Sequence, residues 1–304
     1  MIKVLAVELQ RFAWRRSFRF FGLLALGGIA LAATIVFFTS RPAAQSTRVA
    51  GDPVQQMIDE CARSMEGAEP PRGYGSVEEF CVDMAVSTTE SLDPRFRLTT
   101  LTDIFGGTSI PLIILGLAFG ASFIGAEWHA GTITPLLTWA PRRVPVLVGK
   151  VVAAMIGVFA SAIALQTILG LVLWFVAAVR GTTEGADLAW LGDTAAVAAR
   201  GAIIASLMAT LGFAIASVAR NTTIALIIGF VYFAVGEALI RGLKPGWQPW
   251  LIGDNAAAFV VADPAQIFMA GGARSTLTAL IVVVGYAAAA TAGAAAWFQA
   301  RDVT

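Results

Sequence analysis

The sequence predicts an all-α membrane protein: an N-terminal amphipathic helix, six transmembrane helices, and a small helical extracytoplasmic insertion between the first and second spans. Hydrophobic residues make up 57% of the 304 residues and charged residues only 13%, whereas an average soluble domain has about 25% charged residues. Six apolar runs approach or exceed the roughly 20 residues that a helix needs to cross a bilayer. Such runs form helices because a helix satisfies its own backbone hydrogen bonds in lipid.

The six runs belong to one transmembrane domain that covers residues 1–304. The boundaries of the fourth and fifth runs are the least sharp, because the fourth contains Arg200 and the fifth is uncharged only as far as Glu237. Five cations precede the first run, which favours a retained first span over a cleaved signal peptide. The predicted spans are 20–40, 104–126, 151–179, 194–219, 221–240 and 275–300.

The distribution of lysine and arginine predicts the orientation in the membrane. If the N-terminus is cytoplasmic, the inside segments hold ten cations and three acids, and the outside segment 41–103 holds six arginines and eleven acids. Both termini of this multi-pass protein are therefore expected on the cytoplasmic side of the cell membrane. The formal net charge of +1 gives no indication of binding to nucleic acid.

Residues 1–19 are predicted to form an amphipathic helix at the membrane surface before the first span. Ile2, Leu5, Leu9 and Phe12 share one helical face, and most of the cations lie opposite. Apolar residues also interrupt the polar face. A helix that simply continues into the first span is therefore the alternative.

The insertion after the first span carries both cysteines of the chain, Cys61 and Cys81, in a compartment that permits disulfides. Helix signals, including a capping box from Ser76 to Glu79, predict a short helix on either side of the connector GAEPPRGYG. Both cysteines are equidistant from Pro71, so an antiparallel hairpin would place them at the same height. A disulfide there would contribute on the order of 3 kcal/mol. Two unpaired thiols are the alternative.

Residues 242–273, before the last span, contain too much proline and glycine to cross the membrane. Helix signals at Asp254 and Asp263, together with two tryptophans, favour a re-entrant or interfacial helical pair on the outer side. An ordinary outer loop is the alternative.

The sequence lacks the motifs of several enzyme classes. No phosphate-binding G-x-x-x-x-G-K-[ST] loop and no G-x-S-x-G elbow is present. The single histidine, His129, has no second histidine with which to form a metal site. Catalysis or ion-coupled transport within the membrane would need converging ionisable groups, which the spans lack. We therefore expect no catalytic residue, metal or cofactor in this chain.

Segment 127–150, between the second and third spans, holds one of the few charge clusters. A threonine can cap a short helix that has Pro135 in its first turn and ends at Pro141. Leu136 and Leu137 would give this helix an exposed apolar face, which normally has a partner. The alternative for its glutamate and arginines is plain interfacial charge that follows the positive-inside rule.

The segment contains the pattern Glu127-x-x-x-Gly131-Thr132-Ile133, Leu136-Leu137, Pro141-Arg142-Arg143 and Gly149-Lys150. With these residues it resembles the cytoplasmic segment of permeases of the type-2 ABC exporter family (ABC-2, type V exporter-like). The N-terminal ELQRFAWRR is similar to the elbow helix of that family, and the succession of an elbow, six spans and a large outer loop resembles its topology. His129-Ala130 departs from the pattern, because charged residues often occupy these positions.

The resemblance implies the permease subunit of an ATP-driven exporter. Two permease copies, identical or closely related, would pair with two separate nucleotide-binding subunits, which bind ATP and magnesium. The segment after the second span would be the coupling helix that contacts the ATPase, and the elbow helix would anchor the subunit. The residues carried over are Glu127, Gly131, Thr132, Leu136, Leu137, Trp139, Arg142 and Arg143 for coupling, and Arg11, Arg15 and Arg16 for the elbow.

The scarcity of buried charge favours a lipophilic or amphipathic substrate over a small ion. Gly116-x-x-x-Gly120 and the glycines of the fifth span, Gly229 and Gly236, favour close helix contacts, either at a dimer interface or within one subunit. Residues that could line a translocation pathway are Phe119, Phe123, Gln166, Phe230, Tyr232 and Phe233.

A second hypothesis is a sensor or anchor in the membrane that transports nothing and binds a ligand or partner through its outer disulfide hairpin. Deletion of residues 45–95 would then abolish function, whereas mutants of the segment after the second span would stay active.

Overall fold

A computed structural model describes residues 16–40, 52–65, 67, 74–92, 95–132, 143–261 and 275–300. The chain divides into two compact units, and α2 and α7 contribute to both. Unit 1 comprises Met1–Gly27, Thr102–Leu169 and Leu188–Thr304, and unit 2 comprises Gly28–Leu101 and Gly170–Asp187. The predicted N-terminal amphipathic helix lies outside the described residues, except where α2 begins at Arg16.

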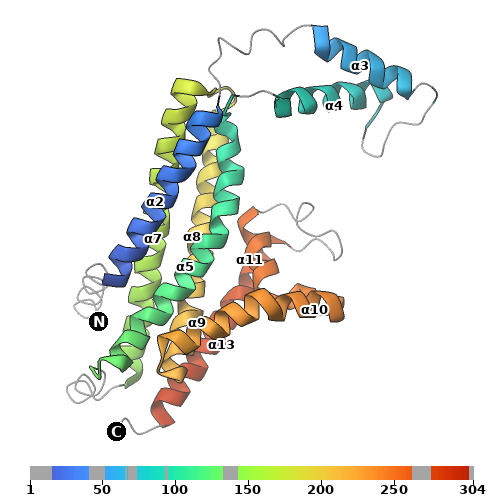
Figure 1. The fold of residues 1–304 in the computed structure, drawn as a ribbon. Helices are drawn as coiled ribbons and strands as arrows, with labels where there is room; N and C mark the ends of the chain where they lie inside the picture. The colour runs from blue at the N-terminus through green and yellow to red at the C-terminus, as the bar shows by residue number, and fades with distance from the viewer. Residues whose placement is uncertain are drawn as a thin grey trace. The chain divides into compact units, whose positions relative to one another are not determined.

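Among the residues that the structure describes, six helices are long and apolar enough to cross a membrane, which confirms the predicted all-α membrane fold (Figure 1). Each predicted run corresponds to one of them. The clearest difference is that the third span begins at Arg143 rather than at 151, because Pro145 is tolerated in a first helical turn. The spans are α2 (Arg16–Thr39), α5 (Leu101–His129), α7 (Arg143–Arg180), α8 (Leu188–Ala219), α9 continued by α10 (Thr222–Val231, Glu237–Leu243), and α13 (Thr276–Ala300).

The fifth span starts abruptly and is not uniform. Arg220 has a left-handed φ of 52°, which turns the chain directly after α8. The side chain of Asn221 then caps α9 by accepting hydrogen bonds from the backbone N–H groups of Thr223 (2.7 Å) and Ile224 (3.2 Å). A π-helical turn, η3 (Tyr232–Gly236), separates α9 from α10. Such turns are rare and occur frequently at functional sites.

Between the fifth and sixth spans, the described part of the chain forms two short helices, namely the 3₁₀-helix η4 (Pro245–Trp250) and α11 (Ile252–Val261). α11 is apolar but too short to span, and it packs against α8 and α13 (Figure 1). It corresponds to the helix predicted near Asp254. The second predicted helix, at Asp263, lies outside the described residues.

Small residues bring the helices of unit 1 together around α8. Gly116 and Gly120 of α5 lie against the backbone of Ala205 and Ala209 of α8, where an added Cβ would collide with the two carbonyl oxygens. Gly229 of α9 instead lies against a side chain of α5, since an added Cβ would be 2.9 Å from both terminal methyl carbons of Leu117. The GxxxG pattern therefore packs within the subunit, which is one of the two arrangements that the sequence left open.

In unit 2, α3 (Asp52–Ser64) and α4 (Val77–Leu92) lie side by side as a hairpin (Figure 1). The predicted disulfide is present: Cys61 is bonded to Cys81, with the Cα atoms 5.7 Å apart. Both cysteines are buried. The bridge encloses the connector between the two helices and reduces the freedom of the unfolded chain.

Hydrogen bonds in unit 2 also tie the end of α2 to the end of α7. Ser40 Oγ donates to the carbonyl oxygen of Arg180 (2.8 Å) and accepts from the backbone N–H of Phe96 (2.9 Å). The guanidinium of Arg180 donates to the carbonyl oxygen of Phe37 (2.9 Å), and Thr182 N–H donates to that of Phe96 (2.9 Å). The chain on both sides of the α3–α4 hairpin is thereby fixed to helix ends.

Candidate functional site

The segment between the second and third spans begins at a sharp helix end. Gly131 has a φ of 66°, a conformation that glycine adopts without strain. Its N–H donates to the carbonyl oxygen of Trp128 (3.2 Å), and the N–H of Thr132 donates to that of Glu127 (3.1 Å). This pair of bonds is a Schellman motif. Gly131 and Thr132, which the resemblance assigned to coupling, therefore end α5 and set the direction in which the segment leaves it.

A buried ion pair connects the two ends of the segment. Nζ of Lys150 lies 3.0 Å from each carboxylate oxygen of Glu127. The Lys150 side chain is 3% exposed and that of Glu127 is 12% exposed. Lys150 also lies 5.9 Å from the centroid of the Phe123 ring. The last turn of α5 is thus bonded to α7, and Glu127 presents little surface to a partner.

Aromatic side chains surround the same end of α5. The guanidinium of Arg220, in the turn after α8, lies 4.6 Å from the centroid of the Trp128 ring, a distance at which cation–π attraction operates. On its other side, Trp128 makes an edge-to-face contact with Phe298 of α13 (centroids 6.1 Å apart). The end of α5 is therefore in contact with α7, the α8–α9 turn and α13.

Most of the other predicted coupling and elbow residues cannot be placed. Leu136, Leu137, Trp139 and Arg142 lie outside the described residues, as do Arg11 and Arg15. Arg143 and Arg16 are the first residues of α7 and α2, and only their backbone is described.

The predicted pathway residues are dispersed over unit 1. Phe119 packs against the rings of Phe18 and Phe21 (5.7 and 5.4 Å), and Phe123 is 1% exposed in the core. Phe230 is 71% exposed on α9, and Tyr232 and Phe233 pack on each other in the π-helical turn. Gln166 is buried in α7. The structure does not bring these six residues to one cavity.

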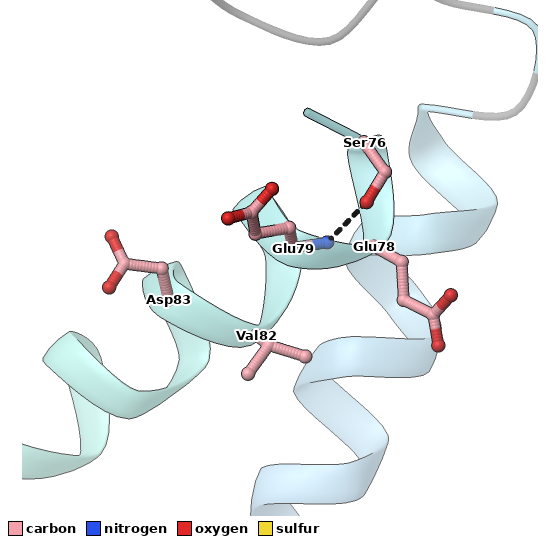
Figure 2. Close-up of a pocket in the computed structure, with 5 residues that line it drawn as sticks. All are labelled: Ser76, Glu78, Glu79, Val82 and Asp83. Atoms are coloured by element: carbon pink, nitrogen blue, oxygen red, sulfur yellow. Dashed lines mark hydrogen bonds between the residues drawn. The ribbon is translucent and has the colours of Figure 1, made fainter. Parts of the chain in front are cut away.

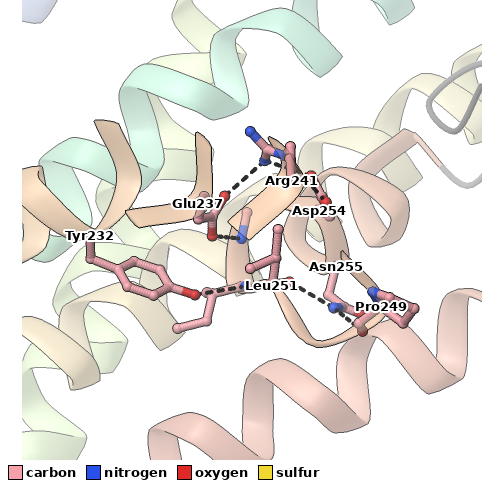
Figure 3. Close-up of polar contacts among 9 residues, drawn as sticks. Tyr232, Glu237, Arg241, Pro249, Leu251, Asp254 and Asn255 are labelled. Carbon is pink, nitrogen blue, oxygen red and sulfur yellow. Dashed lines mark hydrogen bonds and ion pairs between the residues drawn. The ribbon is translucent and has the colours of Figure 1, made fainter. Parts of the chain in front are cut away.

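A second polar cluster joins the fifth span to α11 (Figure 3). The carboxylate of Glu237, which is 2% exposed, accepts from the Arg241 guanidinium (2.9 Å) and from the backbone N–H of Gly253 (2.7 Å). The same guanidinium donates to Asp254 at 2.6 Å. One arginine therefore holds two carboxylates from two helices. The sequence singled out Glu237 and Asp254 separately; the i,i+4 spacing of Glu237 and Arg241 was the available sign of a pair.

Neighbouring side chains satisfy the backbone at the start of α11 (Figure 3). The Tyr232 hydroxyl accepts from the N–H of Ile252 (3.3 Å). Asn255 Nδ2 donates to the carbonyl oxygens of Pro249 (2.9 Å) and Leu251 (2.7 Å). The backbone N–H groups in the first turn of a buried helix have no acceptor within the helix, so they need such partners. The cluster thus fixes α11 to the π-helical part of the fifth span.

The α3–α4 hairpin carries a pocket at the start of α4 (Figure 2). Ser76 Oγ accepts from the N–H of Glu79 (3.1 Å), and the Glu79 carboxylate accepts from the N–H of Gly75 (2.9 Å), so the predicted capping box is present in a shifted form. The Tyr74 hydroxyl donates to Asp83 (2.7 Å), which raises the pKa of Tyr74. The described residues contain no group of three side chains suited to hold a metal. The pocket is lined by Ser76, Glu78, Glu79, Val82 and Asp83.

The chain was compared with known protein families, curated proteins and solved structures. A family model described as "ABC-2 family transporter protein" matches residues 4–247, which include segment 127–150 and five of the six spans. No curated protein and no solved structure matches the chain.

Proposed function

The chain belongs to the ABC-2 family of transporter proteins, and from this premise we propose that it exports a lipophilic or amphipathic substrate with energy from a separate ATPase. Permeases of the family are multi-pass membrane proteins that work with ATPase subunits. In the proposed complex, two permease copies, identical or closely related, bind two ATPase subunits, which hold ATP and magnesium. The complex lies in the cell membrane, with both permease termini in the cytoplasm.

The observation that carries this proposal is the ion pair between Glu127 and Lys150. It bonds the end of α5 to α7 at the base of segment 127–150. A partner that pushes on the segment therefore moves two long helices together, because packed elements shift as rigid bodies. Contacts of Trp128 with Arg220 and Phe298 extend the same connection to α13.

This geometry supports a specific role for Glu127. Its carboxylate faces Lys150 and is mostly buried, so Glu127 acts as a positioning residue and not as the main contact with the ATPase. That contact is proposed for Leu136, Leu137, Trp139, Arg142 and Arg143. The elbow arginines are proposed to anchor the N-terminus in the lipid headgroups.

The buried polar side chains of the described spans support an apolar or amphipathic cargo. Four of the five buried hydroxyls in these spans bond to their own helix backbone, and the buried charges Lys150 and Glu237 are paired within the chain. A transporter of small ions needs membrane-embedded charges that are free to bind them.

Purification tests the assignment. The chain should co-purify with a soluble ATPase encoded beside it, and ATP hydrolysis in proteoliposomes should require both proteins. Leu137→Asp should abolish transport and weaken co-purification. The control is Leu191→Asp, at an exposed site near the N-terminal end of α8, which should leave co-purification intact. Wild-type transport by Leu137→Asp would remove segment 127–150 from the mechanism.

The disulfide-bonded α3–α4 hairpin, with its acidic pocket, supports a second candidate function, a sensor that binds a ligand outside the membrane. In that case, deletion of residues 45–95 should abolish function while Leu137→Asp remains active. The exporter proposal predicts that Leu137→Asp is the inactive variant.

A further inference from the structure

Gln166 is a buried amide without a hydrogen-bond partner. It lies in α7, is 2% exposed, and neither Oε1 nor Nε2 bonds to any described residue. A carboxamide can make up to four hydrogen bonds. Buried polar groups are nearly always paired, because leaving one unpaired is destabilising. An exception of this kind requires a reason.

The buried hydroxyl side chains of α5 and α8 do not share this property. Ser109 in α5 donates to the carbonyl oxygen of Phe105 (2.9 Å), and Ser206 in α8 donates to that of Ala202 (2.8 Å). Each satisfies its hydroxyl within its own helix turn. The longer side chain of Gln166 instead extends away from its backbone to the contact with α8.

Three helices meet at this amide. A Cβ built on Gly201 of α8 would lie 3.2 Å from Gln166 Nε2 and 2.6 Å from Ser109 Oγ. Polar atoms of α5 and α7 therefore face the same point on α8, where the absence of a side chain leaves room for them. Gln166 lies roughly 20 Å along α7 from its Arg180 end, given a rise of 1.5 Å per residue. This depth places the amide well inside a span.

The surroundings of the amide favour an uncharged ligand. A serine hydroxyl of α5 and a glycine of α8, both uncharged, lie at the same point as the amide. Arg200 is next to Gly201 in sequence, but a helix rotates by about 100° per residue, so its guanidinium leaves α8 on a different, partly exposed face. A carboxamide donates and accepts side by side, and its natural complement is a second neutral group that does the same.

We propose that Gln166 is a substrate-recognition residue, whose amide pairs with an uncharged donor–acceptor group, such as a carboxamide, of an amphipathic substrate. The pairing takes place when α8 moves away from α5 and α7 during the transport cycle. This inference rests on the proposed function. It adds to that function the chemical class of the substrate and the residue that selects it.

The test compares three probes with the same hydrocarbon chain. Oleamide donates and accepts hydrogen bonds, methyl oleate only accepts, and oleate is charged. Each is added to the full-length permease in lipid nanodiscs, and the unfolding temperature is measured, since a ligand of the native state raises it. We expect oleamide to raise the unfolding temperature more than the other two. No preference for oleamide, or a preference for oleate, would overturn the proposed substrate class.

Gln166→Leu separates recognition from a structural role, because leucine is similar in size and removes only the polar atoms. The variant without ligand should unfold at a higher temperature than wild type, since a buried unpaired amide is gone. Its apparent affinity for oleamide should fall about tenfold, the effect of losing one or two hydrogen bonds. Ser206→Ala, a buried polar control on α8, should keep the oleamide response. A Gln166→Leu variant that is less stable than wild type, or that binds oleamide normally, would overturn the proposal.

This measurement needs no ATPase, so it separates the two proposals. An oleamide response that depends on Gln166 would support the inference even if no ATPase co-purified. Conversely, ATP-driven transport by Gln166→Leu with unchanged response to oleamide would overturn the inference and leave the exporter assignment in place.

Discussion

Breaking the ion pair between Glu127 and Lys150 should uncouple ATP hydrolysis from transport. Glu127→Gln removes the carboxylate that faces the Lys150 ammonium, and the Lys150 side chain is only 3% exposed. Removing one partner of a buried pair typically costs about 3–5 kcal/mol of stability. We therefore expect Glu127→Gln to lower the free energy of unfolding by roughly that amount and to reduce the transport rate.

The double variant Glu127→Gln/Lys150→Met separates stability from coupling. It leaves no unpaired charge, and replacing a buried pair by neutral groups is often close to neutral for stability. Its unfolding temperature should therefore return towards that of wild type, while the bond between α5 and α7 is still missing. The diagnostic quantity is the number of substrate molecules transported per ATP hydrolysed in proteoliposomes, which should stay low.

Asp103→Asn, which changes an exposed carboxylate at the other end of α5, is the matched control and should alter the free energy of unfolding by no more than about 0.5 kcal/mol. The reasoning would be refuted if the double variant recovered both its stability and wild-type transport per ATP. The pair would then serve only the folded structure.

Three further predictions concern other parts of the chain. Gly120→Leu should prevent folding, or lower the free energy of unfolding by more than about 3 kcal/mol, because the new side chain would collide with the α8 backbone. Unfolding of the variant in detergent would measure this loss of stability. Arg241→Met should weaken the attachment of α11 more than Asp254→Asn does, because Arg241 is ion-paired with two carboxylates. Amide hydrogen exchange in Ile252–Val261 should be faster in Arg241→Met, and unchanged exchange would contradict the prediction. The hydrogen bond to Asp83 raises the pKa of Tyr74, so it stabilises the hairpin fully at pH values below the ordinary tyrosine pKa of about 10. This stabilisation is lost as the pH rises through the raised pKa. Tyr74→Phe should abolish this pH dependence of hairpin stability.

The spans and the disulfide could be predicted because each depends on local or simple geometric information. Twenty apolar residues can only be a helix in lipid, and the symmetry of Cys61 and Cys81 about their connector places them together. The helix end at Gly131 was also readable, since a glycine directly after a long helical pattern is a common C-cap. For Gly131, the family resemblance indicated a position involved in coupling but did not show that the residue ends α5.

The two polar clusters could not be predicted, because they depend on how helices pack. Lys150 was noted only as part of the family pattern, and nothing in its flanks shows that it turns towards Glu127 and is buried there. Likewise, Arg241 meets Asp254 only because the chain reverses between α10 and α11. The GxxxG pattern was ambiguous for the same reason: its spacing predicts a close helix contact but does not show whether the partner helix belongs to the same subunit.

The proposed mechanism requires that an ATPase contacts the segment between Glu127 and Lys150, and cross-linking from position 137 can detect this contact. Both native cysteines are in the disulfide, so Leu137→Cys supplies the single free thiol for a photoactivatable maleimide in native membranes. We predict a cross-link to the ATPase polypeptide whose yield changes between the ATP-bound state and the vanadate-trapped ADP state. A thiol at 137 that cross-links to no second protein in either state would contradict the account.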